Sequence, residues 1–269
     1  MGEDFLEDIM QIHPSSVVSK DAEIEEGAII GPFCVIEGKV KIGSCTVLDS
    51  NVKVGNPYGT VIIGKGNHLF PGSNIGGIPQ DLKYKKENTE LIIGNNNQFR
   101  ESVTVNTGTV TGINHTKIGD GNLLMAYSHI GHDCVLGNNN VIANSVAVAG
   151  HVTIQDKVTV GGLVGLSQFI TVGSYAFVAG YSAVNKDVLP FSMASGIWAT
   201  MRATNKVGME RAGFTEEDIS IANKLIRMFS KSGLRREEVI SKATEELGGE
   251  HKVTKMMLDF AHKSKGLAI

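Results

Sequence analysis

The stretch of sequence that decides the fold runs from residue 118 to residue 184 and reads IGDGNLLMAYSHIGHDCVLGNNNVIANSVAVAGHVTIQDKVTVGGLVGLSQFITVGSYAFVAGYSAV. Every sixth residue in it is aliphatic, and a shorter run with the same period begins at Val18. Six residues of an α-helix rotate by about 600°, which is about 240° out of phase, so the period excludes an amphipathic helix. The two series are Ile118, Leu124, Ile130, Leu136, Ile142, Val148, Ile154, Val160, Leu166, Val172, Val178 and Val184, and Val18, Ile24, Ile30, Ile36, Ile42, Leu48 and Val54.

A period of six suits a three-sided coil of short strands and turns, with about 18 residues in each coil and one aliphatic side chain per side pointing inward. Glycine often follows the aliphatic residue, as at Gly31 and Gly119, where a turn with unusual φ favours it. Cys34 and Cys134 fall in a column of small residues two positions before the aliphatic one, so we interpret them as core residues. The pattern predicts a mainly β solenoid of hexapeptide repeats over residues 1–189.

Two segments break the period, namely residues 71–90 and 106–117, and we expect both to project from the solenoid as loops. The period ends after Val184, and Pro190 and Gly196 mark a linker.

A helical domain follows, so residues 190–269 are predicted to form the linker and a C-terminal α-helical domain. Thr215 precedes three acidic residues and is predicted to cap a helix that ends at Lys231. A second helix is expected from Arg235 to Leu247, and apolar residues at helical spacing from Val253 to Ala261 predict a third.

Composition excludes several classes of protein. The 269 residues are 42% hydrophobic and 20% charged, as in a folded chain, and the net charge of −3 argues against nucleic-acid binding. Three cysteines are too few for a disulfide scaffold. The acidic N-terminus is unlike a secretion signal. The sequence also lacks a run of about 18 apolar residues, so we expect no membrane-spanning helix. We therefore expect a cytoplasmic protein.

Histidines gather where successive coils would stack. With about 18 residues per coil, His132, Gly150 and Gln168 take equivalent positions, roughly 4.8 Å apart per step, and His129 and His151 lie beside them. Three interpretations are open from spacing alone. The cluster is a general base with polar helpers, a metal site, or a set of solvated surface histidines.

A specific similarity to known proteins is carried by residues 79–84, 100–104, 122–134, 149–151 and 211–214. These segments resemble the UDP-N-acetylglucosamine 3-O-acyltransferases, which begin lipid A synthesis. The similarity runs from about residue 11 to the end. The resemblance implies a left-handed parallel β-helix, a homotrimer with sites between subunits, and no metal or other cofactor. It also implies transfer of a 3-hydroxyacyl group from acyl carrier protein to the sugar 3-position.

The resemblance also implies roles for individual residues. His132 matches the general base, Asp133 supports its ring, and Gly150 matches the residue whose N–H faces the developing oxyanion. Asn205 and Arg211 match groups that hold the nucleotide, and Gly180 matches a position that measures acyl length. The remaining polar groups expected to line the substrate cleft are Gln80, Asp81, Lys83, His129, His151 and Gln168.

Some positions depart from the family pattern, and these departures fall around nucleotide and acyl recognition. An acceptor with nitrogen at the 3-position therefore stays open. Two other functions also stay open: a metal-dependent γ-carbonic-anhydrase-like enzyme using His129, His132 and His151, and a non-catalytic scaffold. The departing residues are Asn106, Thr107, Ser167, Ile197 and Ala212.

Acyl carrier proteins are strongly acidic, so a basic surface is expected to face this partner. The candidate residues are Lys83, Lys85, Lys86, Lys224, Arg227, Lys231, Arg235 and Arg236.

Overall fold

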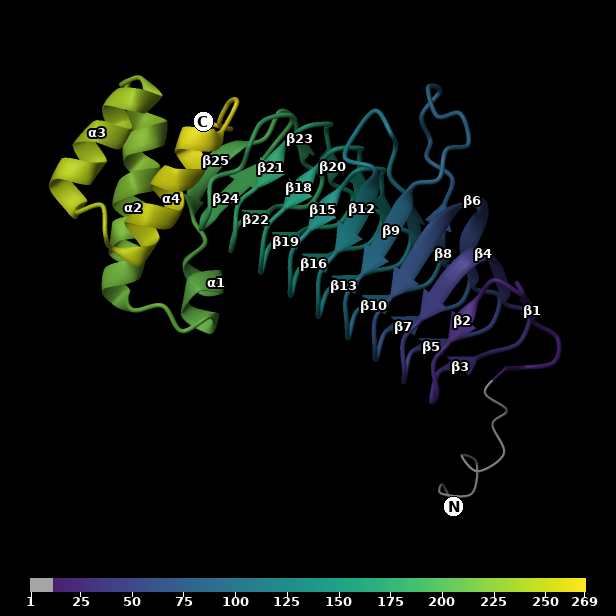
Figure 1. Ribbon diagram of the computed structural model, residues 1–269. Helices are drawn as coiled ribbons and strands as arrows, with labels where there is room; N and C mark the ends of the chain where they lie inside the picture. The colour runs from purple at the N-terminus through teal and green to yellow at the C-terminus, as the bar shows by residue number, and fades with distance from the viewer. Residues whose placement is uncertain (1–11) are drawn as a thin grey trace, which may run out of the picture.

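The computed structural model describes residues 12–269, so the acidic N-terminal segment lies outside the described residues. The chain winds into an elongated solenoid of short parallel strands, and helices gather at its C-terminal end (Figure 1). The predicted mainly β solenoid with C-terminal helices is confirmed, while the left-handed winding stays a prediction from the resemblance. Within residues 12–269, no helix has the length and apolarity needed to cross a membrane.

The solenoid has three faces of stacked strands. Face 1 contains β1 (Val17–Val18), β8 (Asn74–Gly77), β11 (Thr104–Asn106), β14 (His129–Ile130), β17 (Ala147–Val148), β20 (Gly165–Leu166) and β23 (Ala183–Val184). Face 2 contains β2 (Glu23–Ile24), β9 (Glu90–Ile93), β12 (His115–Ile118), β15 (Val135–Leu136), β18 (Thr153–Ile154) and β21 (Thr171–Val172). Two longer strands, β4 (Val35–Ile42) and β6 (Lys53–Ile63), continue from face 1 into face 2.

Face 3 closes the coil and carries the end of the solenoid. Its strands are β3 (Ile29–Ile30), β5 (Val47–Leu48), β7 (His68–Leu69), β10 (Gln98–Phe99), β13 (Leu123–Leu124), β16 (Val141–Ile142), β19 (Thr159–Val160), β22 (Phe177–Val178) and β24 (Ser192–Ser195), with β25 (Thr200–Thr204) antiparallel to β24.

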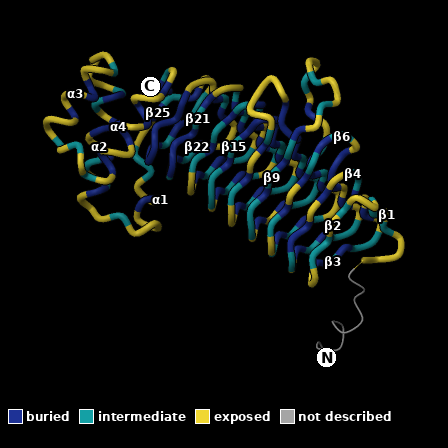
Figure 2. The backbone as a smooth tube through the Cα atoms, in the orientation of Figure 1, coloured by how far each residue is buried: buried dark blue, intermediate teal, exposed yellow. Residues whose placement is uncertain are grey.

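The aliphatic series forms the core. Ile130, Val148 and Leu166 are each at most 2% exposed, and the tube in Figure 2 is dark along the inward positions. The strands of successive coils pair in the same register, 18 residues apart, because His129 pairs with Ala147 and Ala147 pairs with Gly165. Burying one such side chain stabilises the fold by roughly 1.5–3 kcal/mol, so the stacked series holds the coils together.

Three columns of turns join the faces, and we name two of them. The loop corner, between faces 1 and 2, consists of residues 131–134, 149–152 and 167–170. The aromatic corner, between faces 3 and 1, consists of residues 125–128, 143–146, 161–164 and 179–182. Turns at both corners place one residue in the left-handed region, as at Asp133 (φ 60°) and Tyr127 (φ 63°). The third corner holds a buried ladder of amide hydrogen bonds, including Asn122 Nδ2 to Asn97 Oδ1 at 2.9 Å.

Both predicted loops project at the loop corner, where Figure 1 shows them side by side, but both are shorter than predicted. Residues 74–77 form β8, and Ile75 is fully buried, so the first loop spans residues 78–89. The second spans 107–114, because β11 ends at Asn106 and β12 begins at His115. The insertions shift the phase of the six-residue period without ending the strand ladder, so strands continue into both segments.

The C-terminal region has four helices among the described residues: α1 (Lys206–Arg211), α2 (Glu216–Lys231), α3 (Arg236–Leu247) and α4 (Lys252–Lys263). The predicted cap is confirmed, because Thr215 and Asp218 form a capping box. Helix α1 and the strands β24 and β25 were not predicted. Because β24 pairs with β22, part of the predicted linker continues the solenoid sheet. The domain boundary near residue 190 therefore stays a prediction.

Candidate active site

A buried imidazole and carboxylate meet at the loop corner. The turn after β14 places Asp133 in the left-handed region, and its backbone N–H donates to Thr116 Oγ1 at 2.9 Å. His132 Nδ1 lies 2.8 Å from Asp133 Oδ2, and the two side chains are 9% and 0% exposed. The interpretation of these groups as solvated surface histidines is therefore wrong for His132.

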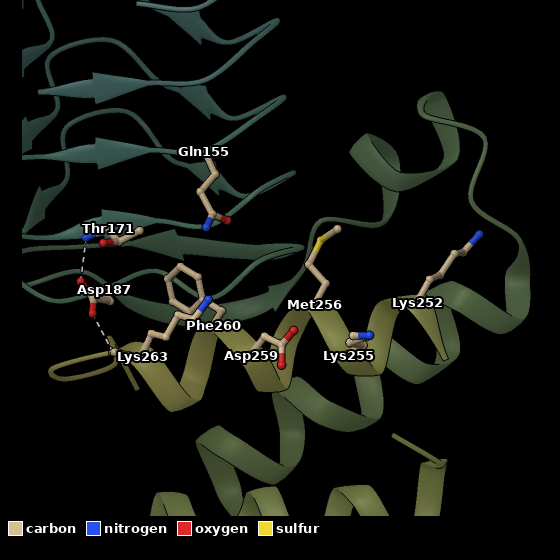
Figure 3. Close-up of a pocket in the computed structure, with 10 residues that line it drawn as sticks. Gln155, Thr171, Asp187, Lys252, Lys255, Met256, Asp259, Phe260 and Lys263 are labelled. Carbon is tan, nitrogen blue, oxygen red and sulfur yellow. Dashed lines mark hydrogen bonds between the residues drawn. The ribbon is translucent and has the colours of Figure 1, made fainter. Parts of the chain in front are cut away.

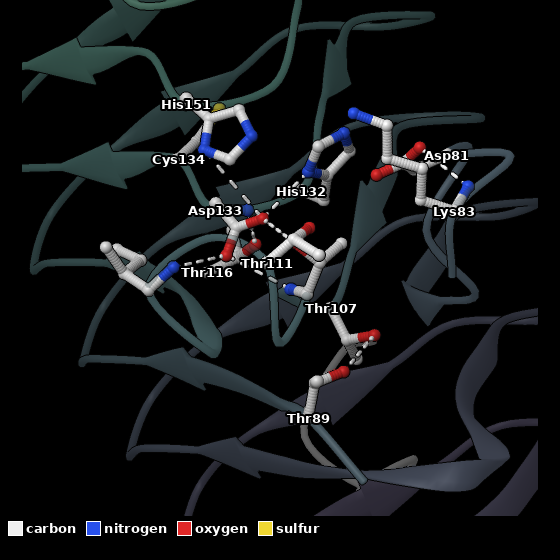
Figure 4. A network of polar contacts seen from close by, with 12 residues as sticks. Asp81, Lys83, Thr89, Thr107, Thr111, Thr116, His132, Asp133, Cys134 and His151 are labelled. Carbon is white, nitrogen blue, oxygen red and sulfur yellow. Dashed lines mark hydrogen bonds and ion pairs between the residues drawn. The ribbon is translucent and has the colours of Figure 1, made fainter. Parts of the chain in front are cut away.

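The Asp133 carboxylate is enclosed by the loop of residues 107–114 (Figure 4). Its Oδ1 accepts hydrogen bonds from the backbone N–H groups of Thr109 and Ile113, at 3.0 and 2.9 Å. Its Oδ2 accepts from Thr109 Oγ1 at 2.6 Å as well as from His132. Burial alone would raise the pKa of Asp133, but these hydrogen bonds outweigh it and hold the pKa below its ordinary value.

This carboxylate fixes the tautomer of His132. An ionised Asp133 only accepts hydrogen bonds, so Nδ1 of His132 carries the hydrogen and Nε2 keeps its lone pair. The arrangement therefore offers a proton acceptor at Nε2.

Gly150 lies directly against this ring. A Cβ built on Gly150 would be 2.6 Å from His132 Cε1 and 2.7 Å from Nε2, so the position has no room for a side chain. Among the described residues, no backbone carbonyl accepts the Gly150 N–H. The predicted stacking of positions 132 and 150 is confirmed, because His151 N donates to His132 O at 2.9 Å.

Two more histidines border the pair. His151 packs edge-on against His132 with ring centroids 4.9 Å apart, and His129 Nδ1 lies 2.8 Å from Thr104 Oγ1. Burial lowers the pKa of His129, and the nearby His132 lowers it further. Burial also lowers the pKa of His151, although Asp133 and Asp81 partly offset the effect. Both rings therefore favour the neutral form.

Phe169 also belongs to this cluster at the loop corner, although it was not predicted from the sequence as a site residue. It stacks on His151 with ring centroids 4.5 Å apart and planes 10° apart, while 59% of Phe169 is exposed. The 18-residue repeat could have identified it, since Phe169 follows His151 by one coil and must stack beside it. Gln168, the third member of the predicted stack, is exposed at the same corner.

The first loop brings further predicted residues to the site. Figure 4 places Asp81 and Lys83 beside His132, and Asp81 is close enough to His151 to affect its pKa. Asp81 Oδ1 accepts the backbone N–H of Lys83 at 2.9 Å, which fixes the turn of the loop. Gln80 and Lys83 are exposed, so both side chains are free to meet a ligand.

Three predicted residues lie away from this cluster within one chain. Gly180 is at the aromatic corner, where its Cβ would be 3.1 Å from Gly162 O. Asn205 caps α1, and its Nδ2 donates to the Tyr175 carbonyl at the third corner. Arg211 is exposed in the last turn of α1.

Two departures from the family pattern tie the loops together. Asn106 is 5% exposed, and its Nδ2 donates to Ile78 O at 3.0 Å. Thr107 is fully buried, with its Oγ1 3.3 Å from Thr89 Oγ1. Both residues brace the base of loop 78–89. By contrast, Ser167 lies at the loop corner, Ile197 is 82% exposed and Ala212 ends α1.

The donor set favours a hydrogen-bonded pair over a metal centre. His132, Asp133 and His151 each bring a ligand atom within 4.8 Å of the others, whereas the predicted metal set used His129 instead of Asp133. Both Asp133 oxygens already accept two hydrogen bonds each. A zinc ion about 2.0–2.2 Å from Asp133 and His132 would displace the Nδ1 hydrogen that fills this contact.

A separate groove of about 560 Å³ lies between α4 and face 2 (Figure 3). Gln155, Thr171 and Phe260 line it, and none of the clustered histidines does. Asp187 closes one end, accepting from Thr171 N and from Ser264 Oγ, both at 2.7 Å. Asp187 therefore joins the end of α4 to the solenoid.

A solenoid of hexapeptide coils with a His–Asp pair at a loop-bearing corner defines a hexapeptide-repeat transferase. In agreement, the family model described as bacterial transferase hexapeptide (six repeats) matches residues 21–56 and 115–150. The model described as UDP N-acetylglucosamine O-acyltransferase, domain 2, matches residues 187–268.

Individual relatives agree with these models. A protein of Neisseria gonorrhoeae named acyl-(acyl-carrier-protein)–UDP-N-acetylglucosamine O-acyltransferase is 43% identical over 95% of this chain and 98% of its own. The protein of the same name from Thermodesulfovibrio yellowstonii is 44% identical over 88% of this chain and 91% of its own. The solved LpxA of Acinetobacter baumannii has a TM-score of 0.93 at 39% identity, covering 97% of this chain and 100% of the other.

The chain belongs to the UDP-N-acetylglucosamine O-acyltransferase family. The resemblance predicted from the sequence is confirmed, and the carbonic-anhydrase-like and scaffold alternatives are not favoured.

Proposed function

We propose that this chain transfers a 3-hydroxyacyl group from acyl carrier protein to the 3-position of UDP-N-acetylglucosamine, the first step of lipid A synthesis. The names of its relatives contain the same donor and acceptor. The observation that carries the proposal is the contact of His132 Nδ1 with Asp133 Oδ2 at 2.8 Å, with the Gly150 backbone against the same ring.

In the first step, Nε2 of His132 takes the proton of the sugar 3-hydroxyl as that oxygen attacks the thioester carbonyl. A C–O bond forms, and the carbonyl electrons move to the oxygen. The Gly150 N–H donates to this oxyanion, and a donor so placed contributes roughly 2.7–4 kcal/mol to transition-state stabilisation. Asp133 stabilises the imidazolium that results.

In the second step, the oxyanion collapses and the C–S bond breaks. The imidazolium of His132 gives its proton to the departing thiolate of acyl carrier protein. The His132 side chain returns to its starting state, because the proton taken from the sugar hydroxyl has been given to the thiolate, and these proton transfers use no metal or other cofactor.

A homotrimer is part of the proposal. Gly180 lies at the aromatic corner, while Asn205 caps α1 and Arg211 lies in its last turn, so a site shared with His132 needs a second subunit to bring them together. An exposed apolar column at the aromatic corner offers a surface for this contact: Tyr127 is 68%, Leu163 is 53% and Tyr181 is 78% exposed. In such a trimer, Gly180 would face the acyl chain of a neighbouring site.

The polar residues around the pair would hold the acceptor. Asp81 and Gln80 would bind the sugar, and Lys83 suits a phosphate because its ammonium is a compact point charge. His129, His151 and Gln168 would line the rest of the cleft. A 3-hydroxyl acceptor is proposed over a 3-amino one, because the relatives are named O-acyltransferases.

Acyl carrier protein would meet the lysines of loop 78–89. Three of the other predicted basic residues suit it less, because Lys224 pairs with Glu246 at 2.8 Å and Arg235 pairs with Glu238 at 3.0 Å. Arg236 likewise contacts Glu237. The cytoplasm, where the sequence predicts this protein to act, is where such substrates would be supplied.

Purified protein, 3-hydroxyacyl carrier protein and UDP-N-acetylglucosamine test the proposal, with mass spectrometry of the product. We expect an O-acylated sugar nucleotide from the wild type and loss of most of the rate in His132→Ala. His68→Ala is the matched control, because His68 also pairs with a carboxylate, Asp49 at 3.1 Å, but lies on β7. Full activity of His132→Ala would reject the assigned role.

A further inference from the structure

We propose that Thr109 is a positioning residue for His132: through Asp133, its hydroxyl holds the imidazole in the tautomer that leaves Nε2 free. The inference rests on the proposed function for its catalytic consequence, whereas the tautomer itself is open to measurement without any substrate. It also assigns a task to loop 107–114, which stands outside the hexapeptide pattern.

The geometry of the carboxylate carries the inference. Thr109 Oγ1 lies 2.6 Å from Asp133 Oδ2, the same oxygen that His132 Nδ1 contacts at 2.8 Å. Asp133 has no other hydroxyl donor to this oxygen among the described residues. The Thr109 hydroxyl occupies one lone pair of Oδ2 and fixes the rotation of the carboxylate, so the other lone pair of Oδ2 is directed at the imidazole N–H.

The other oxygen is fixed by the same loop. The N–H groups of Thr109 and Ile113 both donate to Oδ1, so a short arc of backbone wraps the carboxylate. Gly112 closes the arc, because a Cβ at this position would collide with the Asp133 carboxylate. The backbone thus anchors the loop without the Thr109 side chain, which separates a loop-holding role from a positioning role.

Thr109 is placed to act only through Asp133. It is 1% exposed, so no substrate reaches it. Its hydroxyl also lies 3.2 Å from Thr111 Oγ1, from which it accepts while donating to Asp133. Hydrogen bonds to charged groups typically contribute about 1.5–3 kcal/mol, enough for a lost one to change a rate constant by roughly 10- to 100-fold.

Other titratable groups near the Thr109–Asp133–His132 contacts could also affect the tautomer of the His132 ring. His129 lies on β14, His151 on the next coil and Asp81 on loop 78–89. Among the described residues, none of these three groups forms a hydrogen bond with Thr109, so a change caused by Thr109→Val reaches His132 through Asp133.

The test compares Thr109→Val, Thr109→Ser and Thr111→Val in the full-length chain. Nitrogen NMR of the His132 ring, without substrate, should give the Nδ1–H tautomer in the wild type and a mixture with the Nε2–H tautomer in Thr109→Val. Thr109→Ser, which keeps the hydroxyl, should restore the wild-type tautomer. Thr111→Val is the matched control, because it removes the donor to Thr109 Oγ1 but keeps the hydrogen bond from Thr109 to Asp133, and among the described residues Thr111 makes no hydrogen bond to Asp133.

Kinetics provide the second readout. Thr109→Val should lower kcat about 10- to 100-fold with an unchanged KM for the sugar nucleotide, and Thr109→Ser should recover most of it. A wild-type tautomer and kcat in Thr109→Val would overturn the inference, and so would a loss that Ser does not restore. Absence of acyl transfer by the wild type would instead refute the proposed function, and the tautomer result would stand by itself.

Discussion

The Gly150 backbone and the His132 imidazole are in direct contact, and a Cβ on Gly150 would be 2.6 Å from Cε1 of that ring. By contrast, a Cβ built on Gly165, which lies in β20 on face 1, has no atom within 4 Å. The same solenoid therefore contains one glycine that the site requires and one that it does not.

Gly150→Ala should lower kcat by at least about 100-fold, because the methyl group displaces the base and obstructs the oxyanion donor. Gly165→Ala should keep near-wild-type kcat and a similar melting temperature. Steady-state kinetics and thermal unfolding of the two variants check this. Equal activities of the two variants would show that the close packing of Gly150 on His132 has no part in the reaction.

Asp133→Asn should lower kcat by roughly 10²- to 10⁴-fold, because the amide no longer enforces the Nδ1–H tautomer. The variant should also change the pH dependence of stability. The folded pKa of Asp133 is lowered, so its ionised form stabilises the fold above its unfolded value of about 3.9, and this stabilisation disappears as pH falls through the folded pKa.

Denaturant titrations at a series of pH values measure this effect. Below about pH 4, the free energy of unfolding should fall less steeply with decreasing pH in Asp133→Asn than in the wild type. Parallel curves for the two proteins would contradict the assignment of a lowered pKa to Asp133.

His129 and His151 should titrate below the ordinary value of about 6.5, because burial disfavours their charged forms. The unfolded chain then binds more protons than the folded one between the folded pKa and about 6.5. The stabilisation from both residues is therefore present above pH 6.5 and lost as pH falls through that window. Proton NMR titration of the two rings checks this, and midpoints above 6.5 would contradict it.

Lys85→Gln should raise the KM for acyl carrier protein several-fold while leaving kcat and the KM for the sugar nucleotide unchanged. Lys85 is exposed on loop 78–89, and an acidic partner is attracted to it by a force that salt screens. The difference from wild type should vanish near 1 M salt, where the screening length is about 3 Å. Lys224→Gln is the control, because Glu246 already pairs with Lys224. A larger effect at Lys224 would place the carrier protein on the helices instead.

The periodic part of the molecule was predictable because one rule acts at every coil. Each sixth residue must face the core, so Ile130, Val148 and Leu166 are buried as the spacing predicts. The same repeat brings Gly150 to His132, since equivalent positions of neighbouring coils must stack.

The two loops, residues 78–89 and 107–114, do not follow the six-residue period, so the sequence does not predict their conformations. Thr109 and Ile113 reach Asp133 only because loop 107–114 folds back over the corner, and no spacing in the sequence encodes that path. Helix α1 was missed because it is short, although Asn205 is a typical cap residue. In the proposed trimer, Gly180 has a role only beside a second subunit, and the sequence of one chain does not reveal such neighbours directly.

A single-turnover experiment measures what His132 contributes to acyl transfer, with the wild type and His132→Ala each in excess over acyl carrier protein carrying a 3-hydroxyacyl group. We expect both proteins to bind UDP-N-acetylglucosamine with similar affinity, while the rate of acyl transfer falls by roughly 10²- to 10⁴-fold in the variant. An unchanged transfer rate, with binding intact, would contradict the role of His132 as the base.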